Sequence, residues 1–415
     1  MKRLAILIAA LLLAFLPALA EDANSCADCH GKQVGRLSEP VTLWKSSIHH
    51  EVGIKCVNCH GGNPWSEKMK QAHSRSNGWI GKPDAAATVK LCGTCHADAT
   101  FMKKYNPNAR TDQLDLYKTS HHGANILQKK DGRAATCASC HGAHDVLKAT
   151  NPQAHVYPLN VVDTCGKCHG DKKLMEDFGI SGEQVADYKT SVHYEALAEK
   201  DDLFAPTCND CHGNHGAIPP GITSILNVCG TCHVMNQQLF NESPHQDWEE
   251  MGFRMCVECH NNHAIPHPTE DMLSQSDGVC LNCHAEGEPA YDTMMAMHKA
   301  IAGLKTGIEQ EKEQTEAAAE KGMFMDDAFL TLQDAHNAYI QSRTAVHKFS
   351  EAHVEDVVKG GMTSLETVSK MARTALQEVK DRRSGLYVFL VMLLIIVVLI
   401  GFKVRSMEHG DKTEE

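Results

Sequence analysis

Two uninterrupted apolar runs lie near the two ends of this 415-residue chain. The first, residues 4–16, follows two basic residues and precedes an Ala-Leu-Ala triplet, which is the pattern of a secretory signal peptide. We therefore expect residues 1–20 to be removed and the mature chain to begin at Glu21. An uncleaved N-terminal anchor is the alternative, although the run is short for a membrane span of about 20 residues.

The second run, residues 386–402, contains no charged residue and is flanked on both sides by Arg and Lys. Its length is at the short limit for a transmembrane helix. We predict one span at 385–402, and a buried core helix is the alternative. Because the signal peptide exports everything before the span, we expect residues 403–415 to be cytoplasmic. The rest of the chain would then lie on the periplasmic side of the cytoplasmic membrane.

The segment before the span has the apolar spacing of amphipathic helices. We expect helices at about 292–320 and 325–358, and a third that runs from about 363 into the span. Gly322 and the pair Gly360–Gly361 mark the predicted breaks. Three long helices joined by short turns predict an antiparallel bundle at 287–384.

Residues 21–286 contain all 18 cysteines of the chain. Every cysteine belongs to one of nine C-x-x-C-H motifs, the attachment signature of c-type haem. Two thiols at this spacing form thioethers to one porphyrin, and the next histidine ligates the iron as the proximal ligand. The predicted thioether residues are Cys26, Cys29, Cys56, Cys59, Cys92, Cys95, Cys137, Cys140, Cys165, Cys168, Cys208, Cys211, Cys229, Cys232, Cys256, Cys259, Cys280 and Cys283. The predicted proximal ligands are His30, His60, His96, His141, His169, His212, His233, His260 and His284.

Three other uses of cysteine fit less well. Thioredoxin-like redox pairs and zinc sites do not need a histidine after each pair. Secreted disulfides would not place every cysteine at a single spacing. We therefore predict nine covalently attached haems c, and the export signal agrees with haem attachment outside the cytoplasm.

The same region contains four tandem repeats. Each begins with an aromatic residue, continues with a polar triplet ending in Ser, and has a His five positions after the aromatic. The aromatic residues are Trp44, Tyr117, Tyr188 and Phe240. Each repeat then contains two C-x-x-C-H motifs, so the leading Cys26 motif makes the ninth.

The repeats select candidates for the distal, sixth ligand of each iron. One set follows the Ser of each repeat, and a second lies three residues after the proximal His of the first motif. The first repeat has Asn63 at that second position, so we expect His73 instead. For the ninth ligand we choose His298, with His155 and His267 as alternatives. The predicted distal ligands are His49, His73, His122, His144, His193, His215, His245, His263 and His298.

These ligands predict the fold of the haem region. Roughly 265 residues would enclose nine haems, and only 6% of the chain is aromatic. The haems themselves would then form most of the core. We expect a mainly α protein with much irregular loop, followed by the helical bundle and one transmembrane helix. In the bundle, His336 and His347 are predicted to share one helix face. One hypothesis is a ligand or a proton-handling group near a haem. The other is that the two histidines are part of a polar face of the bundle.

The function that follows is electron transfer, since iron with two imidazole ligands has no open position for a substrate. We expect no catalytic residues, and electrons passing between a membrane donor and a periplasmic redox protein or reductase. The alternative is a multihaem reductase of nitrite, hydroxylamine or a sulfur oxyanion, which needs one open haem. A haem store or redox sensor is a third hypothesis. The formal charge of −12 argues against nucleic acid.

The haem region resembles the periplasmic multihaem cytochromes c with paired C-x-x-C-H motifs. The likeness rests on the nine motifs, the Ser-x-His segments, and the Cys-His-Gly-x-His segments that contain His141 and His212. The tail, with residues 345–349 ahead of an apolar helix, is similar to cytochromes that accompany quinol-oxidising complexes in anaerobic respiration. This second resemblance implies membrane quinol-oxidising subunits as partners. The chain differs from multihaem membrane quinol dehydrogenases, whose anchor is N-terminal.

Overall fold

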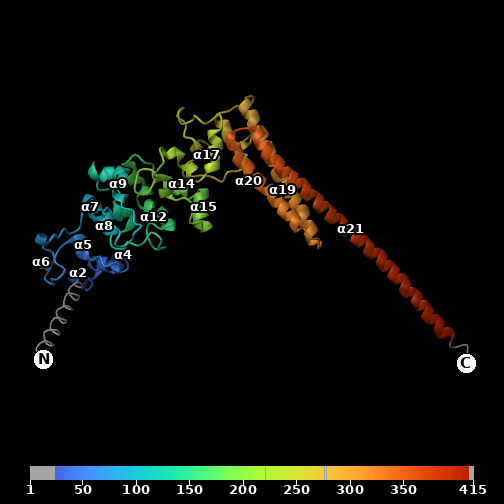
Figure 1. Ribbon diagram of the computed structural model, residues 1–415, viewed down its shortest axis with the longest axis horizontal. Helices are drawn as coiled ribbons and strands as arrows, with labels where there is room; N and C mark the ends of the chain where they lie inside the picture. Colours follow the sequence, from blue (N-terminus) through green and yellow to red (C-terminus); the bar gives the residue numbers. More distant parts are fainter. Residues whose placement is uncertain (1–23, 220, 275, 277, 411–415) are drawn as a thin grey trace, which may run out of the picture. The chain divides into compact units, whose positions relative to one another are not determined.

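The computed structural model describes residues 24–410 except 220, 275 and 277 (Figure 1). The predicted signal peptide and the last five residues of the predicted cytoplasmic tail lie outside the described residues. Regular structure in the described part is entirely helical, which confirms the predicted fold class. The chain forms two compact units. Unit 1 comprises residues 1–228 and 261–267, and unit 2 comprises residues 229–260 and 268–415.

Unit 1 consists of short helices joined by irregular loops. Its α-helices are α2 (Ser25–His30), α3 (Glu39–Lys45), α4 (Ile48–Glu51), α5 (Cys56–His60), α6 (Met69–Ala72), α7 (Ala85–His96), α8 (Ala99–Met102), α9 (Gln113–Thr119), α10 (His121–Leu127), α11 (Cys137–His141), α12 (Pro158–His169), α13 (Lys172–Glu176), α14 (Gln184–Tyr188), α15 (Val192–Glu199) and α16 (Cys208–His212). Two 3-10 turns, η2 (Gly35–Leu37) and η3 (Arg75–Asn77), lie between them, and η4 (Ile225–Thr231) crosses the unit boundary.

The first motif of each repeat forms a helix of only five residues, α5, α11, α16 or α18. Each helix ends at the motif His because the next residue has a positive φ, which ends an α-helix. In three repeats that residue is a glycine, and in the fourth it is Asn261 with φ 67°. A Cβ on Gly61 would lie only 2.1 Å from the carbonyl oxygen of Gly78. The turn therefore redirects the chain immediately after the proximal ligand.

Unit 2 contains three haem motifs and the three long helices of the tail. Its elements are α17 (Val234–Asn241), α18 (Cys256–His260), η5 (Glu270–Leu273), η6 (Val279–Asn282), α19 (Pro289–Glu320), α20 (Asp326–Ala345), η7 (Val346–Lys348) and α21 (Glu351–Gly410). The long helices pack side by side over part of their length (Figure 1). Buried Met297, Leu304, Leu332, Val354 and Val368 belong to their shared core.

The predicted helix break at Gly360–Gly361 is wrong. Both glycines lie inside α21, and the chain turns at 346–350 instead, where Phe349 has φ 52°. A Cβ on Gly361 would lie 2.9 Å from the Cβ of Ala338 and from a methyl carbon of Leu304. The glycine therefore permits close approach of neighbouring helices, a role that looks the same in sequence as a helix break. The break at Gly322 is confirmed, since α19 ends at Glu320.

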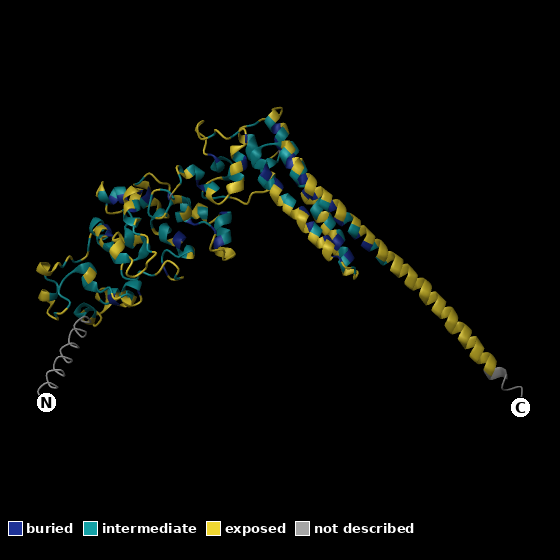
Figure 2. Ribbon diagram, in the orientation of Figure 1, coloured by how far each residue is buried: buried dark blue, intermediate teal, exposed yellow. Residues whose placement is uncertain are grey.

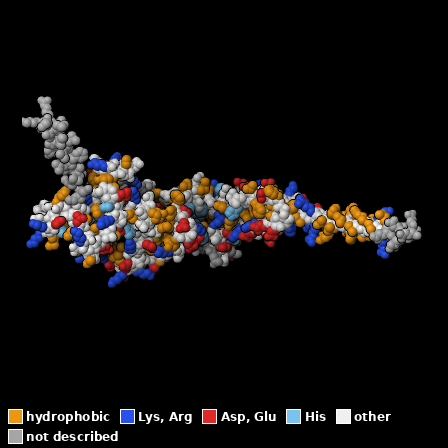
Figure 3. Space-filling model, turned by 90° about the horizontal axis from the view of Figure 1, so that it is seen from below, with side chains coloured by type: hydrophobic (Ala, Val, Ile, Leu, Met, Phe, Trp, Pro, Cys, Tyr) orange, Lys and Arg blue, Asp and Glu red, His pale blue; other side chains and the backbone are white. Residues whose placement is uncertain are grey.

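The second apolar run forms the exposed end of α21 (Figure 2). Among the described residues α21 is the one helix long and apolar enough to cross a membrane. Its apolar side chains from Leu386 to Phe402 are all exposed, and orange side chains cover this end of the helix in Figure 3. Exposed apolar side chains over that length fit a membrane anchor.

Candidate haem centres

Among the ring contacts that the structure describes, eight motif histidines lie opposite a second histidine from another part of the chain. The centroids of the two imidazole rings are 5.8–6.2 Å apart in every pair. The pairs are His30–His73, His60–His144, His96–His49, His141–His215, His169–His122, His212–His263, His260–His347 and His284–His245.

This spacing fits an iron held between the two rings. Metal–imidazole bonds are about 2.0 Å long, so two imidazoles on opposite sides of one metal need ring centroids roughly 6 Å apart. Rings in direct van der Waals stacking would lie closer. Each pair also adjoins two cysteines at the spacing that porphyrin attachment requires. The residues present therefore fit a c-type haem with one histidine on each face.

Several of these histidines have the ring orientation that iron ligation needs. The Nδ1–H groups of His60, His73 and His347 donate to the carbonyl oxygens of Gly81, Met69 and Thr344, each at 2.9 Å. A carbonyl oxygen only accepts, so Nδ1 carries the proton and Nε2 keeps its lone pair for the metal.

Burial also favours iron ligation, because it lowers the pKa of most of the paired histidines. It disfavours the charged imidazolium, and nearby histidines lower the pKa of several of them further. A neutral ring is the form that binds iron. The histidines with a lowered pKa are His49, His96, His122, His141, His144, His169, His212, His215, His245, His260, His263 and His347.

The pairs fall into two geometric classes that follow the repeat. At the first motif of each repeat the two rings are close to parallel, with interplanar angles of 6° to 24°. At the leading motif and at three second motifs they are crossed, with angles of 51° to 71°. The repeat therefore encodes two kinds of ligand arrangement.

The two classes take their distal histidine from different places. At a second motif, the distal His comes from the aromatic-Ser-His segment of the same repeat, as His122 does for His169. At a first motif it comes from the next repeat, as His215 does for His141. Each repeat is thus completed by the one that follows it. The first repeat donates His73 back to the leading motif, which explains why Asn63 departs from the pattern without leaving that motif unpaired.

The fourth repeat has no repeat after it, and the bundle supplies its distal histidine. His347, on η7 between α20 and α21, lies 6.0 Å from His260 between ring centroids. Its Nε2 accepts a long 3.4 Å hydrogen bond from the side-chain amide of Asn236. His298, the residue chosen from the sequence, lies on α19 in the same unit, and its place as a distal ligand stays an untested prediction. His336 instead lies against Tyr339.

The two alternative candidates for the ninth ligand bind carboxylates. Nε2 of His155 lies 2.8 Å from Asp145, and Nε2 of His267 lies 2.5 Å from Glu195. His193 lies in the first turn of α15, two residues after Ser191, which caps this helix. Its place as a distal ligand remains a prediction from the repeat, as does the haem at the Cys229–Cys232 motif.

The aromatic-Ser-His segment positions its histidine through two sets of hydrogen bonds. The buried Ser47, Ser120 and Ser191 each cap the helix that carries the distal His, accepting a backbone N–H three residues ahead at 3.0–3.2 Å. Each hydroxyl also donates, at 2.7 Å, to the carbonyl oxygen of the aromatic residue. The repeat pattern in the sequence predicts the segment but not these bonds.

The aromatic side chains connect the same segment to the neighbouring motif. Trp44 Nε1–H donates to the carbonyl of Ile54 at 2.9 Å, and the Tyr117 hydroxyl donates to Ala135 at 2.7 Å. The Tyr188 hydroxyl donates to Pro206 at 2.7 Å. Each acceptor lies two residues before the first Cys of a motif. The segment that carries the distal ligand of one motif is therefore linked to the attachment site of the preceding motif.

Cysteines of consecutive motifs lie close together within each unit. The thiols of Cys92 and Cys137 are within hydrogen-bonding reach, and so are those of two other pairs, Cys165–Cys208 and Cys229–Cys256. In four further pairs the second thiol is near enough to raise the pKa of the first: Cys26 and Cys56, Cys59 and Cys95, Cys140 and Cys168, and Cys259 and Cys280. Attached haems would thus be neighbours in the order of their motifs, from the first to the sixth in unit 1 and from the seventh to the ninth in unit 2.

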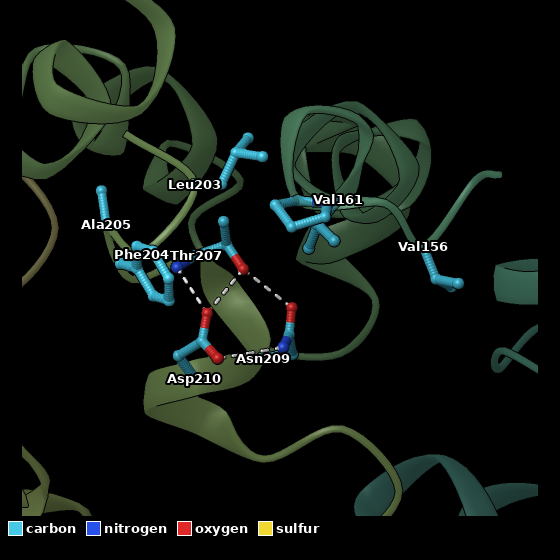
Figure 4. Close-up of a pocket in the computed structure, with 9 residues that line it drawn as sticks. Val156, Val161, Leu203, Phe204, Ala205, Thr207, Asn209 and Asp210 are labelled. Carbon is cyan, nitrogen blue, oxygen red and sulfur yellow. Dashed lines mark hydrogen bonds between the residues drawn. The ribbon is translucent and has the colours of Figure 1, made fainter. Parts of the chain in front are cut away.

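Other features of the structure give no separate metal or ligand site. No cluster of three or more His, Cys, Asp or Glu in the described residues has the geometry of a metal site. A cavity of about 240 Å³ lies beside the start of α16 (Figure 4). There Thr207 donates to Asn209 and to Asp210, in the capping box of the helix that carries the Cys208 motif. These bonds stabilise the motif helix.

Comparison with known proteins agrees with the geometry. The model of the family described as "Doubled CXXCH motif" matches residues 248–289. The multiheme cytochrome MtrA of Shewanella baltica is 25% identical over 284 residues, which cover 61% of this chain and 81% of MtrA. The C-type polyheme cytochrome OmcB of Geobacter sulfurreducens is 23% identical over 64% of this chain, but the match spans only 28% of OmcB. No solved structure matches the chain.

The chain is accordingly a multihaem c-type cytochrome. It binds haem c covalently and its function is electron transfer.

Proposed function

We propose that the chain holds nine haems, each with two histidine ligands, and that electrons pass from haem to haem in the order of the motifs. The observation that carries the proposal is the set of eight histidine pairs at 5.8–6.2 Å between ring centroids. His193 would serve as the remaining distal ligand by its register in the repeat. Bound haem supplies an iron that gains or loses one electron.

The protein contributes position and ligand saturation. Two cysteines fix each porphyrin, and two neutral imidazoles occupy both axial positions, so no coordination site is left for a substrate. Rigid ligands keep the iron environment similar in both oxidation states. Motifs that are neighbours in space allow the electron to cross a short gap, and the rate of electron transfer falls steeply with distance.

The proposed location is the periplasmic side of the cytoplasmic membrane, with a quinol-linked membrane donor and a periplasmic acceptor. The exposed apolar end of α21 supports membrane attachment. The same unit contains the anchor helix, His347 and three haem motifs. His347, which completes the histidine pair of the fourth repeat, and the membrane anchor therefore belong to one unit. This unit would hold the last haems at a fixed height above the membrane.

The mass of the denatured mature protein tests the haem number. Thioether bonds survive denaturation, so the chain should be heavier than its sequence from residue 21 by nine haem masses. A mass with eight haems would show an empty motif, and disulfides in place of haem would overturn the proposal. Reduced protein should also bind no carbon monoxide, whereas stoichiometric binding would favour a reductase with one open haem.

A further inference from the structure

The leading motif, Cys26–Cys29 on α2, lies at the start of the sequence-ordered row of haems in unit 1. Cys29 is exposed, so the porphyrin edge that it would hold would lie near the protein surface. The end of a row is where an electron enters or leaves. The surroundings of this haem therefore decide which partner can reach it.

Two loops lie beside the leading motif, and both are hydrogen-bonded to residues of this site. The backbone N–H and the hydroxyl of Ser25 donate to the carbonyls of Pro64 and Ser66, each at 3.0 Å. The ring of proximal His30 donates through Nδ1 to Leu37 at 3.2 Å, and that of distal His73 donates to Met69 at 2.9 Å. Residues 31–37 and 64–75 are thus held in place by the attachment and ligand residues themselves.

These loops expose large apolar side chains beside the haem. They are Val34 at 89% exposure, Leu37 at 50%, Trp65 at 59% and Met69 at 71%. The apolar edge of the porphyrin adds to them. We refer to these four residues and the basic side chains around them as the leading-haem surface.

The charge around this apolar centre is positive, although the protein as a whole is acidic. Residues 24–82 contain eight Lys and Arg against four Asp and Glu, in a chain with a formal charge of −12. Blue side chains are visible over this part of unit 1, at the left in Figure 3. Five exposed cations lie on these two loops, and none forms an ion pair within the described part of the chain: Lys32, Arg36, Lys68, Lys70 and Arg75.

We propose that the leading-haem surface docks an electron-transfer protein that presents an acidic face. The inference rests on the proposed function and adds the chemistry of the partner. An apolar centre with a charged rim is the usual anatomy of a transient protein interface, and complementary charge mainly raises the association rate. With haem bound at Cys26 and Cys29, the leading iron would be oxidised from ferrous to ferric in each encounter, and the redox centre of the partner would be reduced by that one electron.

The test uses the full-length holoprotein in detergent, reduced chemically and freed of reductant. Its oxidation by an acidic blue-copper protein, oxidised plastocyanin, is followed by stopped flow at low ionic strength. The variant Lys68→Glu/Lys70→Glu/Arg75→Glu should react at least about tenfold more slowly, because electrostatic steering changes association rates by 10- to 1,000-fold. Added salt should slow the wild type and have little effect on the variant.

A matched variant, Lys299→Glu/Lys359→Glu/Lys370→Glu, makes the same change in net charge on exposed positions of α19 and α21. It should react at nearly the wild-type rate. The second variant Lys32→Glu/Arg36→Glu tests the other loop if the first does not fold. Equal slowing in the matched variant, or no slowing in either loop variant, would overturn the docking inference.

Haem content separates this inference from the proposed function. A protein that carries its haems and is fully reduced by dithionite, but reacts with plastocyanin at a rate independent of these charges, contradicts only the docking surface. A protein without covalent haem contradicts both. A basic c-type cytochrome as oxidant provides the opposite control, since the first variant should accelerate its reaction.

Discussion

The imidazole rings of His141 and His215 lie 6.1 Å apart between centroids and only 6° from parallel, although the two residues belong to different repeats. The same relationship joins His60 to His144 and recurs at each first motif. No repeat can therefore complete its own first haem. This is the behaviour of a repeat array, in which each unit is stabilised by its neighbour and the last one needs a cap.

The cap of the array predicts the effect of replacing His347. His347→Ala should leave one iron with a single histidine, and the reduced protein should then bind about one carbon monoxide per chain. His298→Ala, on α19 of the same unit, is the matched control and should bind none. Carbon monoxide titration of the two variants measures this directly. Binding in the His298 variant alone would support His298 as the distal ligand and contradict the cap.

The hydrogen bonds of the aromatic-Ser-His segment predict a loss of stability on their removal. Ser120→Ala leaves the buried N–H of Gly123 without its acceptor and should cost about 1 kcal/mol, the usual value for a lost N-cap. Tyr117→Phe, which removes the bond to Ala135, should cost a similar amount, about 1 kcal/mol.

Thermal denaturation followed by haem absorbance compares these variants with Thr119→Ala. The Thr119 hydroxyl is exposed and bonds only within its own helix, so its removal should lower the Tm least. Partial rescue by Ser120→Thr would show that the hydroxyl itself matters. A Tm for Ser120→Ala equal to that of Thr119→Ala would show that the cap contributes no stability.

A carboxylate that holds a loop against the bundle predicts acid sensitivity. Glu270 accepts hydrogen bonds from Lys305 and from the Tyr339 hydroxyl. Burial alone would raise the pKa of Glu270, but these bonds and a backbone bond lower it to about 2. Because the folded-state pKa lies below the unfolded value of about 4.3, the stabilisation is present above that value and is lost as the pH falls toward 2.

The Glu270→Gln variant should therefore lose stability at neutral pH and show a weaker decline between about pH 4.5 and 2 than the wild type. Denaturant unfolding of unit 2, followed by helical circular dichroism, measures both. Parallel pH profiles for the two proteins would show that Glu270 does not contribute.

Truncation after Arg383 tests the role proposed for the anchor helix. The product should be soluble and reducible by dithionite, and it should hold the same number of haems as the full chain. In membranes it should take electrons from the quinol pool much more slowly, because the last haems would no longer be held near the donor. Equal rates at equal concentration would show that the anchor is only a tether, and that the donor is soluble.

The sequence predicted much of this arrangement, and packing explains the rest. The repeat register selected His122 and His245, and the structure brings each beside a motif histidine. Alignment of the repeats shows which histidines are equivalent, but it does not show which motif each histidine faces. The pairing of histidines from different repeats therefore could not be predicted from the sequence. His347 is outside the repeats and has no equivalent to align with.

The helix breaks show a similar limit. Gly322 and Gly361 look alike in sequence, since both lower helix propensity. Gly322 has φ 82° and belongs to a turn, whereas Gly361 permits the approach of Ala338 and Leu304. Only the neighbours in space distinguish a glycine that ends a helix from one that lets helices pack closely.

Low-temperature electron paramagnetic resonance of the oxidised protein tests the central claim, that every iron lies between two histidines. Ligand-ring orientation sets the splitting of the iron d orbitals, so near-parallel rings give rhombic low-spin signals and crossed rings give signals with one large g value. The structure predicts both types, four of the parallel kind and at least four of the crossed kind, which integrate together to nine low-spin irons per chain. A stoichiometric high-spin signal would reveal an open haem and contradict the account, and so would a spectrum with only one type of low-spin iron.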